Sequence, residues 1–106
     1  MALEIKWLPD AQKDLAAIYD YLEQNYTERE INRFFDKLEH ALSNIAIFPY
    51  MYRQSKFGQA IRQCVLIKQI SLIYRIKEDR IEILLLFDNR QNPNRLEYLI
   101  KTDLSK

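Results

Sequence analysis

Cationic side chains that could bind phosphate or carboxylate are concentrated around the longest irregular stretch of the sequence, residues 49–59. Arg53 and Lys56 lie within this stretch, and Arg62 follows at the start of the next apolar run. Such cations can neutralise phosphates of a nucleic acid or meet acidic side chains on a protein. The predicted target-binding residues are therefore Arg53, Lys56 and Arg62.

Aromatic rings are interleaved with these cations. Tyr50, Tyr52 and Phe57 give the stretch the composition of a site that stacks on bases while it neutralises phosphate. A second interpretation stays open, in which Tyr50, Met51 and Phe57 only pin the loop to the hydrophobic core. Loops often carry function, so both interpretations concern the part of the chain where a site is expected.

The charge distribution supports a basic region. Residues 1–39 hold nine acids and five bases, a balance of −4, and residues 78–106 contribute −1. Between them, from His40 to Lys77, there is no acid. The cations of that region are Arg53, Lys56, Arg62, Lys68, Arg75 and Lys77, which bring the total to the net +1 of the chain. Such a region could meet phosphate or an acidic partner, or it could keep an exposed strand edge solvated.

The sequence holds few residues of the types that form disulfides, metal sites or catalytic sites. Cys64 is the only cysteine, so it can neither form an internal disulfide nor join other thiols around zinc. His40 falls on the polar side of a predicted helix and is expected at the surface. Glycine-rich phosphate loops, paired-histidine metal motifs and nucleophile motifs are missing from the sequence. The sequence predicts no metal and no cofactor, and it does not decide whether the chain is an enzyme.

Length and composition predict a single domain over residues 1–106. The chain has 106 residues, of which 48% are hydrophobic, enough for one core. Lys6 interrupts the apolar N-terminal run, and no long uncharged apolar stretch occurs elsewhere. We therefore expect neither a signal peptide nor a membrane span, and a location in the cytoplasm.

The N-terminal half predicts a strand and two helices. Residues 3–7 alternate apolar and polar side chains, and Pro9 then suits the first turn of a helix. Apolar residues recur at helical spacing over 11–26 and again over 31–45. Between these segments, Thr27-Glu-Arg-Glu30 has the pattern of a capping box, which predicts the start of the second helix.

The C-terminal half predicts three further strands, at 60–66, 70–76 and 80–87. Only Lys77 to Arg80 separates the last two, so they form a hairpin. The order strand, helix, helix, strand, strand, strand predicts an α+β domain: a helical hairpin on one face of a small, mainly antiparallel, four-stranded sheet.

The predicted hairpin is apolar on both sides. Strict alternation directs Ile70, Leu72, Tyr74 and Ile76 inward, together with Ile81, Ile83, Leu85 and Phe87. It then leaves Ile73, Leu84 and Leu86 on the second side, which would be polar if it faced water. Either the C-terminal segment folds back over this side, or a partner chain covers it.

An ordered set of residues resembles the RelE/ParE superfamily of bacterial toxins. The resemblance begins with Trp7, Pro9, Ala11, Asp14-Leu15, Ile18 and Tyr21. It continues through Pro49, Ile61-Arg62, Tyr74-Arg75-Ile76, Ile83 to Phe87, Arg90 and Pro93. It implies the toxin of a type II toxin–antitoxin pair, which a cognate antitoxin neutralises by direct binding. The expected antitoxin-binding residues are the second-side set of Ile73, Leu84 and Leu86.

The superfamily contains two functional classes. Members that resemble RelE cleave mRNA in the ribosome, which requires clustered cations and an acid–base group. Here the place of a late-strand arginine is apolar, at Val65 and Leu66, and no histidine follows the last strand. If the chain were such a nuclease, its catalytic residues would be Arg62, Arg90 and Tyr98, with the ribosome and mRNA as partners.

Members that resemble ParE bind and block DNA gyrase, which requires a complementary surface and no catalytic constellation. The Ile61-Arg-Gln-Cys64 segment resembles such members, and a net charge of +1 is low for a protein that must hold ribosomal RNA. The resemblance therefore favours a ParE-like toxin that arrests growth by inhibiting gyrase, with the RelE-like nuclease as the alternative.

Overall fold

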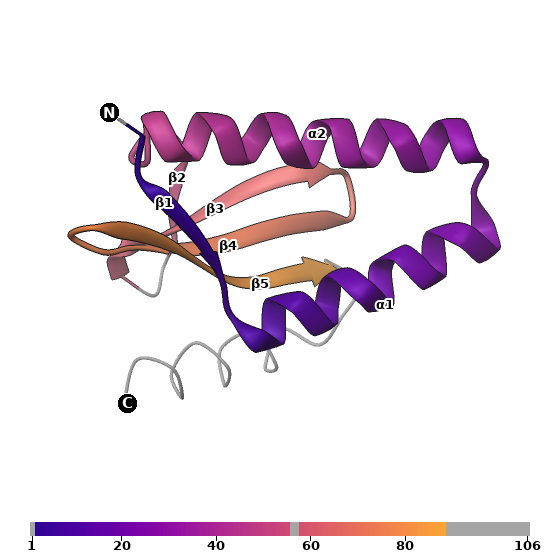
Figure 1. Ribbon diagram of the computed structural model, residues 1–106, viewed down its shortest axis with the longest axis horizontal. Coiled ribbons are helices and arrows are strands. Elements are labelled where there is room, and N and C mark those ends of the chain that lie inside the picture. Colours follow the sequence, from indigo (N-terminus) through magenta and orange to yellow (C-terminus); the bar gives the residue numbers. More distant parts are fainter. Residues whose placement is uncertain (1, 56–57, 89–106) are drawn as a thin grey trace.

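The computed structural model describes residues 2–55 and 58–88, with the backbone alone for Gly58 and Gln59. Its elements follow the predicted order, with one additional short strand (Figure 1). They are β1 (Glu4–Trp7), α1 (Pro9–Asn25), α2 (Glu28–Ile47), β2 (Arg53–Ser55), β3 (Gly58–Ile67), β4 (Ile70–Ile76) and β5 (Arg80–Asp88).

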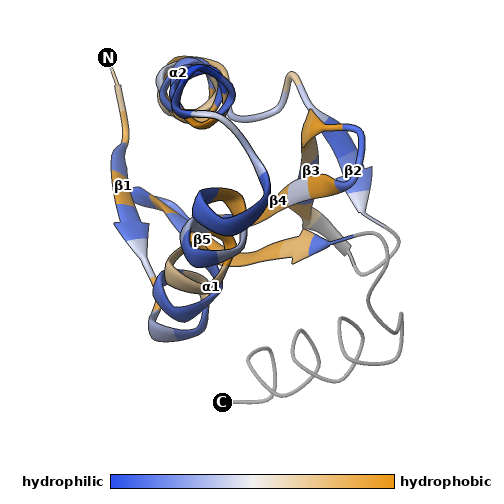
Figure 2. Ribbon diagram, turned by 90° about the vertical axis from the view of Figure 1, so that its right-hand side faces the viewer, coloured by the Kyte–Doolittle hydropathy of each residue, from blue (hydrophilic) through white to orange (hydrophobic). Residues whose placement is uncertain are grey.

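The two helices pack against one face of a twisted sheet, which confirms the predicted α+β architecture (Figures 1 and 2). Leu22 of α1 and Phe34, Leu38 and Ile45 of α2 belong to the same buried cluster as strand residues such as Leu72. These helical residues share one face because they recur every three or four positions. The main core therefore lies between the helix layer and the sheet.

The sheet has the order β1-β5-β4-β3-β2. Strand β1 runs parallel to β5, with Trp7 opposite Ile83, and the remaining pairs are antiparallel. The helical hairpin is long enough to carry the chain from β1 across the sheet, so that β5 can pair in parallel beside it. The predicted hairpin of β4 and β5 is confirmed, and the Lys77 N–H donates to the carbonyl of Arg80 at 2.9 Å across its tip.

The prediction of four strands was one too low. Strand β2 lies in the stretch predicted to be irregular, where Arg53 pairs with Gln63 and Gln54 with Arg62. Three residues are too few for an alternating pattern to be recognised in the sequence. Its pairing with β3 places two of the three predicted target-binding cations on neighbouring strands.

The predicted capping box is present at the start of α2. The Glu30 N–H donates to Thr27 Oγ1 at 3.2 Å, and the Thr27 N–H donates to Glu30 Oε1 at 3.0 Å. Hydrogen bonds from the backbone and hydroxyl of Thr27 lower the pKa of the Glu30 carboxyl. Both bonds satisfy backbone N–H groups that the helix itself leaves without partners.

Thr27→Ala is expected to lower the free energy of unfolding by about 1 kcal/mol, because it removes the hydroxyl that accepts the hydrogen bond from the Glu30 N–H. A urea titration measures the change. Thr27→Ser keeps the hydroxyl and is the matched control, expected to stay close to the parent. Equal urea midpoints for the alanine variant and the parent would show that the box does not stabilise α2.

A β-bulge interrupts the pairing of β4 with β5. Ile73 lies opposite Leu85, but Tyr74 lies opposite Ile83, so that Leu84 is the extra residue on β5. One inserted residue reverses the side to which every later side chain points, because strand side chains alternate with period two. The inward and outward sets predicted for β5 are therefore exchanged beyond Ile83.

The predicted placement of Leu86 beside Ile73 and Leu84 is wrong for this reason. Leu86 belongs to the main core under the helices, and its N–H donates to Asp14 Oδ2 of α1 at 3.3 Å. Leu85 and Phe87, predicted to face inward, join a second buried cluster on the other side of the sheet. That cluster consists of Ile61, Ile73, Leu84, Leu85 and Phe87, with Leu8 packed against it.

In the part of the chain that the structure describes, neither helix is both long and apolar enough to cross a membrane.

Candidate functional site

The described cations of the predicted target-binding set lie at one corner of the molecule, where α2 ends and β2 pairs with β3 (Figure 1). Arg53 is exposed on β2, and Arg62 is half-buried on β3. Lys56, the third predicted cation, lies outside the described residues. So do Arg90 and Tyr98, the remaining residues predicted for the nuclease alternative.

Arg62 is held in place by the residues of the loop before β2. Its Nη1 donates to the backbone carbonyl of Tyr52 at 3.1 Å, and its guanidinium carbon lies 5.2 Å from the centre of the Tyr50 ring. Its Nε is buried and has no hydrogen-bond partner among the described residues. One nitrogen of Arg62 thus stabilises the loop, while its charge stays next to an exposed aromatic ring.

Hydrogen bonds fix the backbone between α2 and β2. The Phe48 N–H donates to the carbonyl of Asn44 at 2.7 Å and closes the helix, and the Met51 N–H donates to the carbonyl of Phe48 at 3.1 Å. Tyr74 Oη, from β4 in the core, donates to the carbonyl of Pro49 at 2.6 Å. The loop is therefore anchored through its backbone and through the buried Tyr74.

Exposed apolar side chains crowd this anchored turn. The exposed fractions are 55% for Ile47, 62% for Phe48, 63% for Tyr50 and 57% for Met51. We call these four residues the corner patch. The interpretation in which Tyr50 and Met51 pin the loop to the core is therefore wrong. Phe57, the third residue named in that interpretation, lies outside the described residues.

The exposure of Ile47 and Phe48 was not predicted from the sequence. A signal was present, because Ile47 follows Ile45 by two positions and so falls off the buried face of α2. An apolar residue off the helical stripe, followed by an aromatic residue and proline, was the pattern that could have indicated an exposed patch.

The ionisable groups packed beneath the corner are held in their protonated forms. Burial raises the pKa of Tyr52, of the Cys64 thiol and, most strongly, of Tyr74. Cys64 is buried, and His40 is exposed on α2, as predicted. Tyrosines and a thiol with raised pKa values are poor proton acceptors at neutral pH, so these three groups do not supply the base that RNA cleavage needs.

The predicted antitoxin-binding residues are distributed over both sides of the sheet. Leu86 lies under the helices, whereas Ile73 and Leu84 belong to the second cluster and are 1% and 0% exposed. Both are already buried in the single chain, so their burial requires no partner. The C-terminal segment, which was the other predicted cover for the second side of the hairpin, lies outside the described residues.

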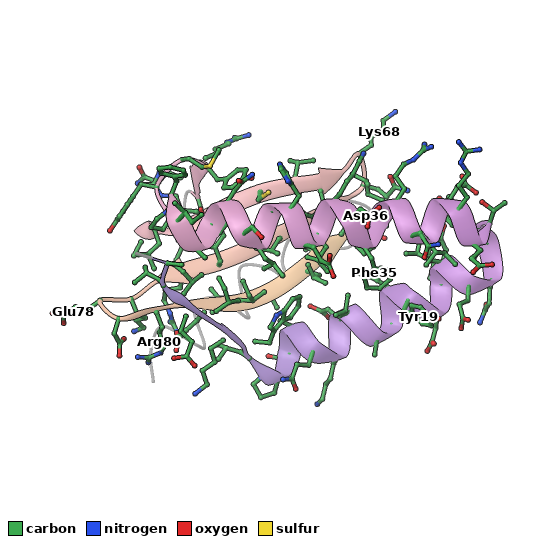
Figure 3. The ribbon with its side chains drawn as sticks, turned by 45° about the horizontal axis from the view of Figure 1, so that its top comes forward. Tyr19, Phe35, Asp36, Lys68, Glu78 and Arg80 are labelled. Atoms are coloured by element: carbon green, nitrogen blue, oxygen red, sulfur yellow. The ribbon has the colours of Figure 1, made fainter. Side chains whose placement is uncertain are left out.

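An ion pair adjoins this second cluster. Arg75 Nη2 lies 2.7 Å from Glu82 Oε1, and Arg80 Nη2 lies 3.2 Å from Glu82 Oε2. Burial by itself would raise the pKa of Glu82, but the hydrogen bonds and charges of Arg75 and Arg80 outweigh it and lower the pKa. In Figure 3, Arg80 and Glu78 lie at the tip of the β4–β5 hairpin.

A further apolar groove lies between α1 and α2, next to the end of β1. It has a volume of about 520 Å³ and is lined by Trp7, Leu15, Tyr19 and Phe35, among other residues. Tyr19 of α1 and Phe35 of α2 approach each other there, with ring centres 5.9 Å apart (Figure 3). This groove is separate from the cations of the corner.

Several solved structures of toxins and toxin–antitoxin complexes share this fold. The chromosomal ParDE system from P. aeruginosa is 21% identical, with a TM-score of 0.67, and the match covers 82% of this chain and 96% of that one. The YoeB dimer from Staphylococcus aureus is 18% identical, with a TM-score of 0.57 and coverages of 82% and 97%. The E. coli DinJ-YafQ complex is 11% identical, with a TM-score of 0.56 and coverages of 83% and 93%. At these identities the similarity shows the fold alone.

The family follows from the sequence match. Residues 5–93 match the family described as ParE toxin of type II toxin-antitoxin system, parDE. A comparison with proteins of curated function gives no match. Since the family match spans most of the chain, the protein is a member of the ParE toxin family of type II toxin–antitoxin systems, within the RelE/ParE superfamily that its residues resemble.

Proposed function

We propose that this toxin arrests growth by binding and inhibiting DNA gyrase, and that a cognate antitoxin neutralises it. The corner is suited to binding because it presents exposed apolar side chains beside Arg62, which the loop holds in place. The family match to ParE toxins points the same way. The observation that carries the proposal is the match of residues 5–93 to the ParE toxin family.

The antitoxin is the second proposed partner. ParDE, YoeB-YefM and DinJ-YafQ are toxin–antitoxin systems or complexes with this fold. We retain the proposal that the antitoxin contacts the second side of the sheet at Ile73 and Leu84, with Phe87 in the place predicted for Leu86. Because Ile73 and Leu84 are buried in the single chain, the antitoxin would have to open this side in order to reach them.

A second candidate function is ribosome-dependent cleavage of mRNA. The feature in its favour is that Arg53 and Arg62 lie on the paired strands β2 and β3, which gives this edge of the sheet two cations that could each contact a phosphate of an RNA. Arg90 would join them, and Tyr98 would serve as the acid–base residue. In this alternative, Tyr98→Phe is expected to slow cleavage by roughly 10²-fold or more.

A direct assay separates the two functions. Purified toxin, freed from antitoxin, is expected to inhibit supercoiling by gyrase and to leave mRNA on stalled ribosomes uncut. Adding back the antitoxin should restore supercoiling, which controls for inhibition by contaminants. Cleavage mapped within the ribosomal decoding site, together with unaffected supercoiling, would replace the gyrase proposal by the nuclease one.

A further inference from the structure

We propose that the corner patch, flanked by Arg53 and Arg62, is the surface through which this toxin docks on a protein target that presents acidic side chains around an apolar depression. The inference rests on the proposed function in that it assumes a protein target. It goes further in assigning the contact to Ile47, Phe48, Tyr50 and Met51 and in stating the chemistry of the surface they meet.

The exposure of the corner patch is the first support. Four large apolar side chains stand within five consecutive residues, and each is more than half exposed. Of the other large apolar side chains that the structure describes as exposed, Tyr19 and Tyr21 are on α1 and Val65 is on β3. Isolated exposed apolar residues need no explanation, whereas a cluster of them commonly marks an interaction site.

The second support is that the patch is ordered before any partner binds. The hydrogen bonds from Phe48, Met51 and Tyr74 fix the turn that carries it, and one of them comes from the buried core. A rigid apolar turn loses little conformational entropy on binding, so more of the burial contributes to affinity. Aromatic residues and arginine in such a setting are typical of the residues that dominate binding energy in interfaces.

Charge indicates what the partner presents. Arg53 is exposed two residues after Met51, and the Arg62 guanidinium lies against the Tyr50 ring. No acidic residue occurs between His40 and Lys77, so the corner has no carboxylate of its own from this part of the sequence to offset the cations. Complementarity therefore requires acidic side chains at the rim of the partner's apolar depression.

The same residues favour a protein over RNA. A single-stranded RNA site uses aromatic faces on which successive bases stack. Ile47 and Met51 have no aromatic face, and the Tyr50 ring has the Arg62 guanidinium 5.2 Å from its centre. A mixed aliphatic and aromatic patch flanked by arginines suits a protein surface instead.

Two variants test the proposal with intact gyrase as the probe. The first combines Ile47→Ser with Met51→Ser and removes the aliphatic side chains of the corner patch. The second, Arg53→Glu, reverses the charge of the exposed arginine that flanks the patch. Each is expected to weaken binding to gyrase by about 10-fold or more and to reduce growth arrest on induction without antitoxin. Both should keep antitoxin binding and the parent's urea midpoint, since the replaced side chains are exposed.

Val65→Ser is the matched control. Val65 is 62% exposed on β3 and is not part of the corner patch, so its replacement is expected to change neither gyrase binding nor growth arrest. Equal binding of gyrase by the parent and by both corner variants would overturn the docking surface while leaving the gyrase proposal intact. Growth arrest that is lost in the corner variants, although the parent neither binds gyrase nor cuts mRNA, would support the surface and remove gyrase as the target.

Three results contradict the proposal in other ways. Loss of antitoxin binding in the corner variants would make the patch an antitoxin site. Ribosome-dependent mRNA cleavage by the parent, abolished in the variants, would make it an RNA site. A parent protein that does not arrest growth would remove both the proposed function and the docking surface.

Discussion

Leu84→Asp is expected to leave the isolated protein largely unfolded. Leu84 is fully buried in the second cluster, beside Ile73 and Leu85. Replacement of a buried leucine by a small side chain costs about 2–5 kcal/mol, and an uncompensated buried charge adds about 3–5 kcal/mol. Together these terms are comparable with the whole stability of a small domain, about 5–15 kcal/mol.

From the sequence, Leu84 was expected to contact the antitoxin on the second side of the hairpin, but in the structure it is 0% exposed within the single chain. Far-UV circular dichroism and a urea titration of the isolated variant measure the outcome. Val65→Asp places the same charge at an exposed strand position and is expected to change stability by no more than about 0.5 kcal/mol. A Leu84→Asp variant with the parent's urea midpoint would show that Leu84 is accessible to water.

Glu82→Leu is expected to destabilise the protein by about 3–5 kcal/mol, because it leaves Arg75 buried without its partner. The side chains of Arg75 and Glu82 are 12% and 8% exposed, and Arg75 Nε and Nη2 both donate to Glu82 Oε1. Replacing both partners, as Arg75→Met with Glu82→Leu, should recover much of the loss. A urea titration of the single and double variants measures the difference.

The exposed pair of Arg80 and Asp79 provides a matched control for this prediction. Their side chains are 36% and 75% exposed, so Asp79→Ala is expected to cost less than about 1 kcal/mol. If Glu82→Leu were as mild as Asp79→Ala, the Arg75–Glu82 pair would have to be solvated rather than buried.

The pH dependence of stability follows from the same pair. The pKa of Glu82 is lower in the folded protein than in the unfolded chain, where that of a glutamate is about 4.3. Its contribution is therefore fully present above that pH and is lost as the pH falls through the folded pKa. Urea midpoints measured through this acid range should fall less steeply for Glu82→Gln than for the parent. Equal slopes would contradict this role for Glu82.

Local features of the fold were predictable from the sequence. The capping box at Thr27 depends on groups three residues apart, and the β4–β5 hairpin depends on a short polar connection between alternating strands. The helix faces follow from a period of 3.6 residues. Each of these signals lies within one segment of the chain, so pattern and propensity suffice to predict it. The resemblance to the toxin superfamily likewise required only the order of residues along the sequence.

The bulge at Leu84 could not be predicted in this way. The strand reads as a continuous apolar run from Ile83 to Phe87, and a run that is apolar at every position gives no sign of where the alternation shifts. Pairing with β4 decides it, by placing Ile83 opposite Tyr74 and Leu85 opposite Ile73. That single extra residue moved Leu86 from the predicted antitoxin side to the core beneath the helices.

The composition of the candidate site was determined by the sequence, and its geometry by the tertiary structure. The sequence placed cations and rings around residues 49–62, but it did not show that Tyr50 and Met51 are exposed. Nor did it show that Tyr74 donates a hydrogen bond to Pro49, 25 positions away, in the turn that carries them. The pairing of β2 with β3, which places Arg53 opposite Gln63 and Gln54 opposite Arg62, depends likewise on the folded sheet. Side-chain exposure and long-range pairing arise only when distant segments pack together, which is why the tertiary structure alone decided them.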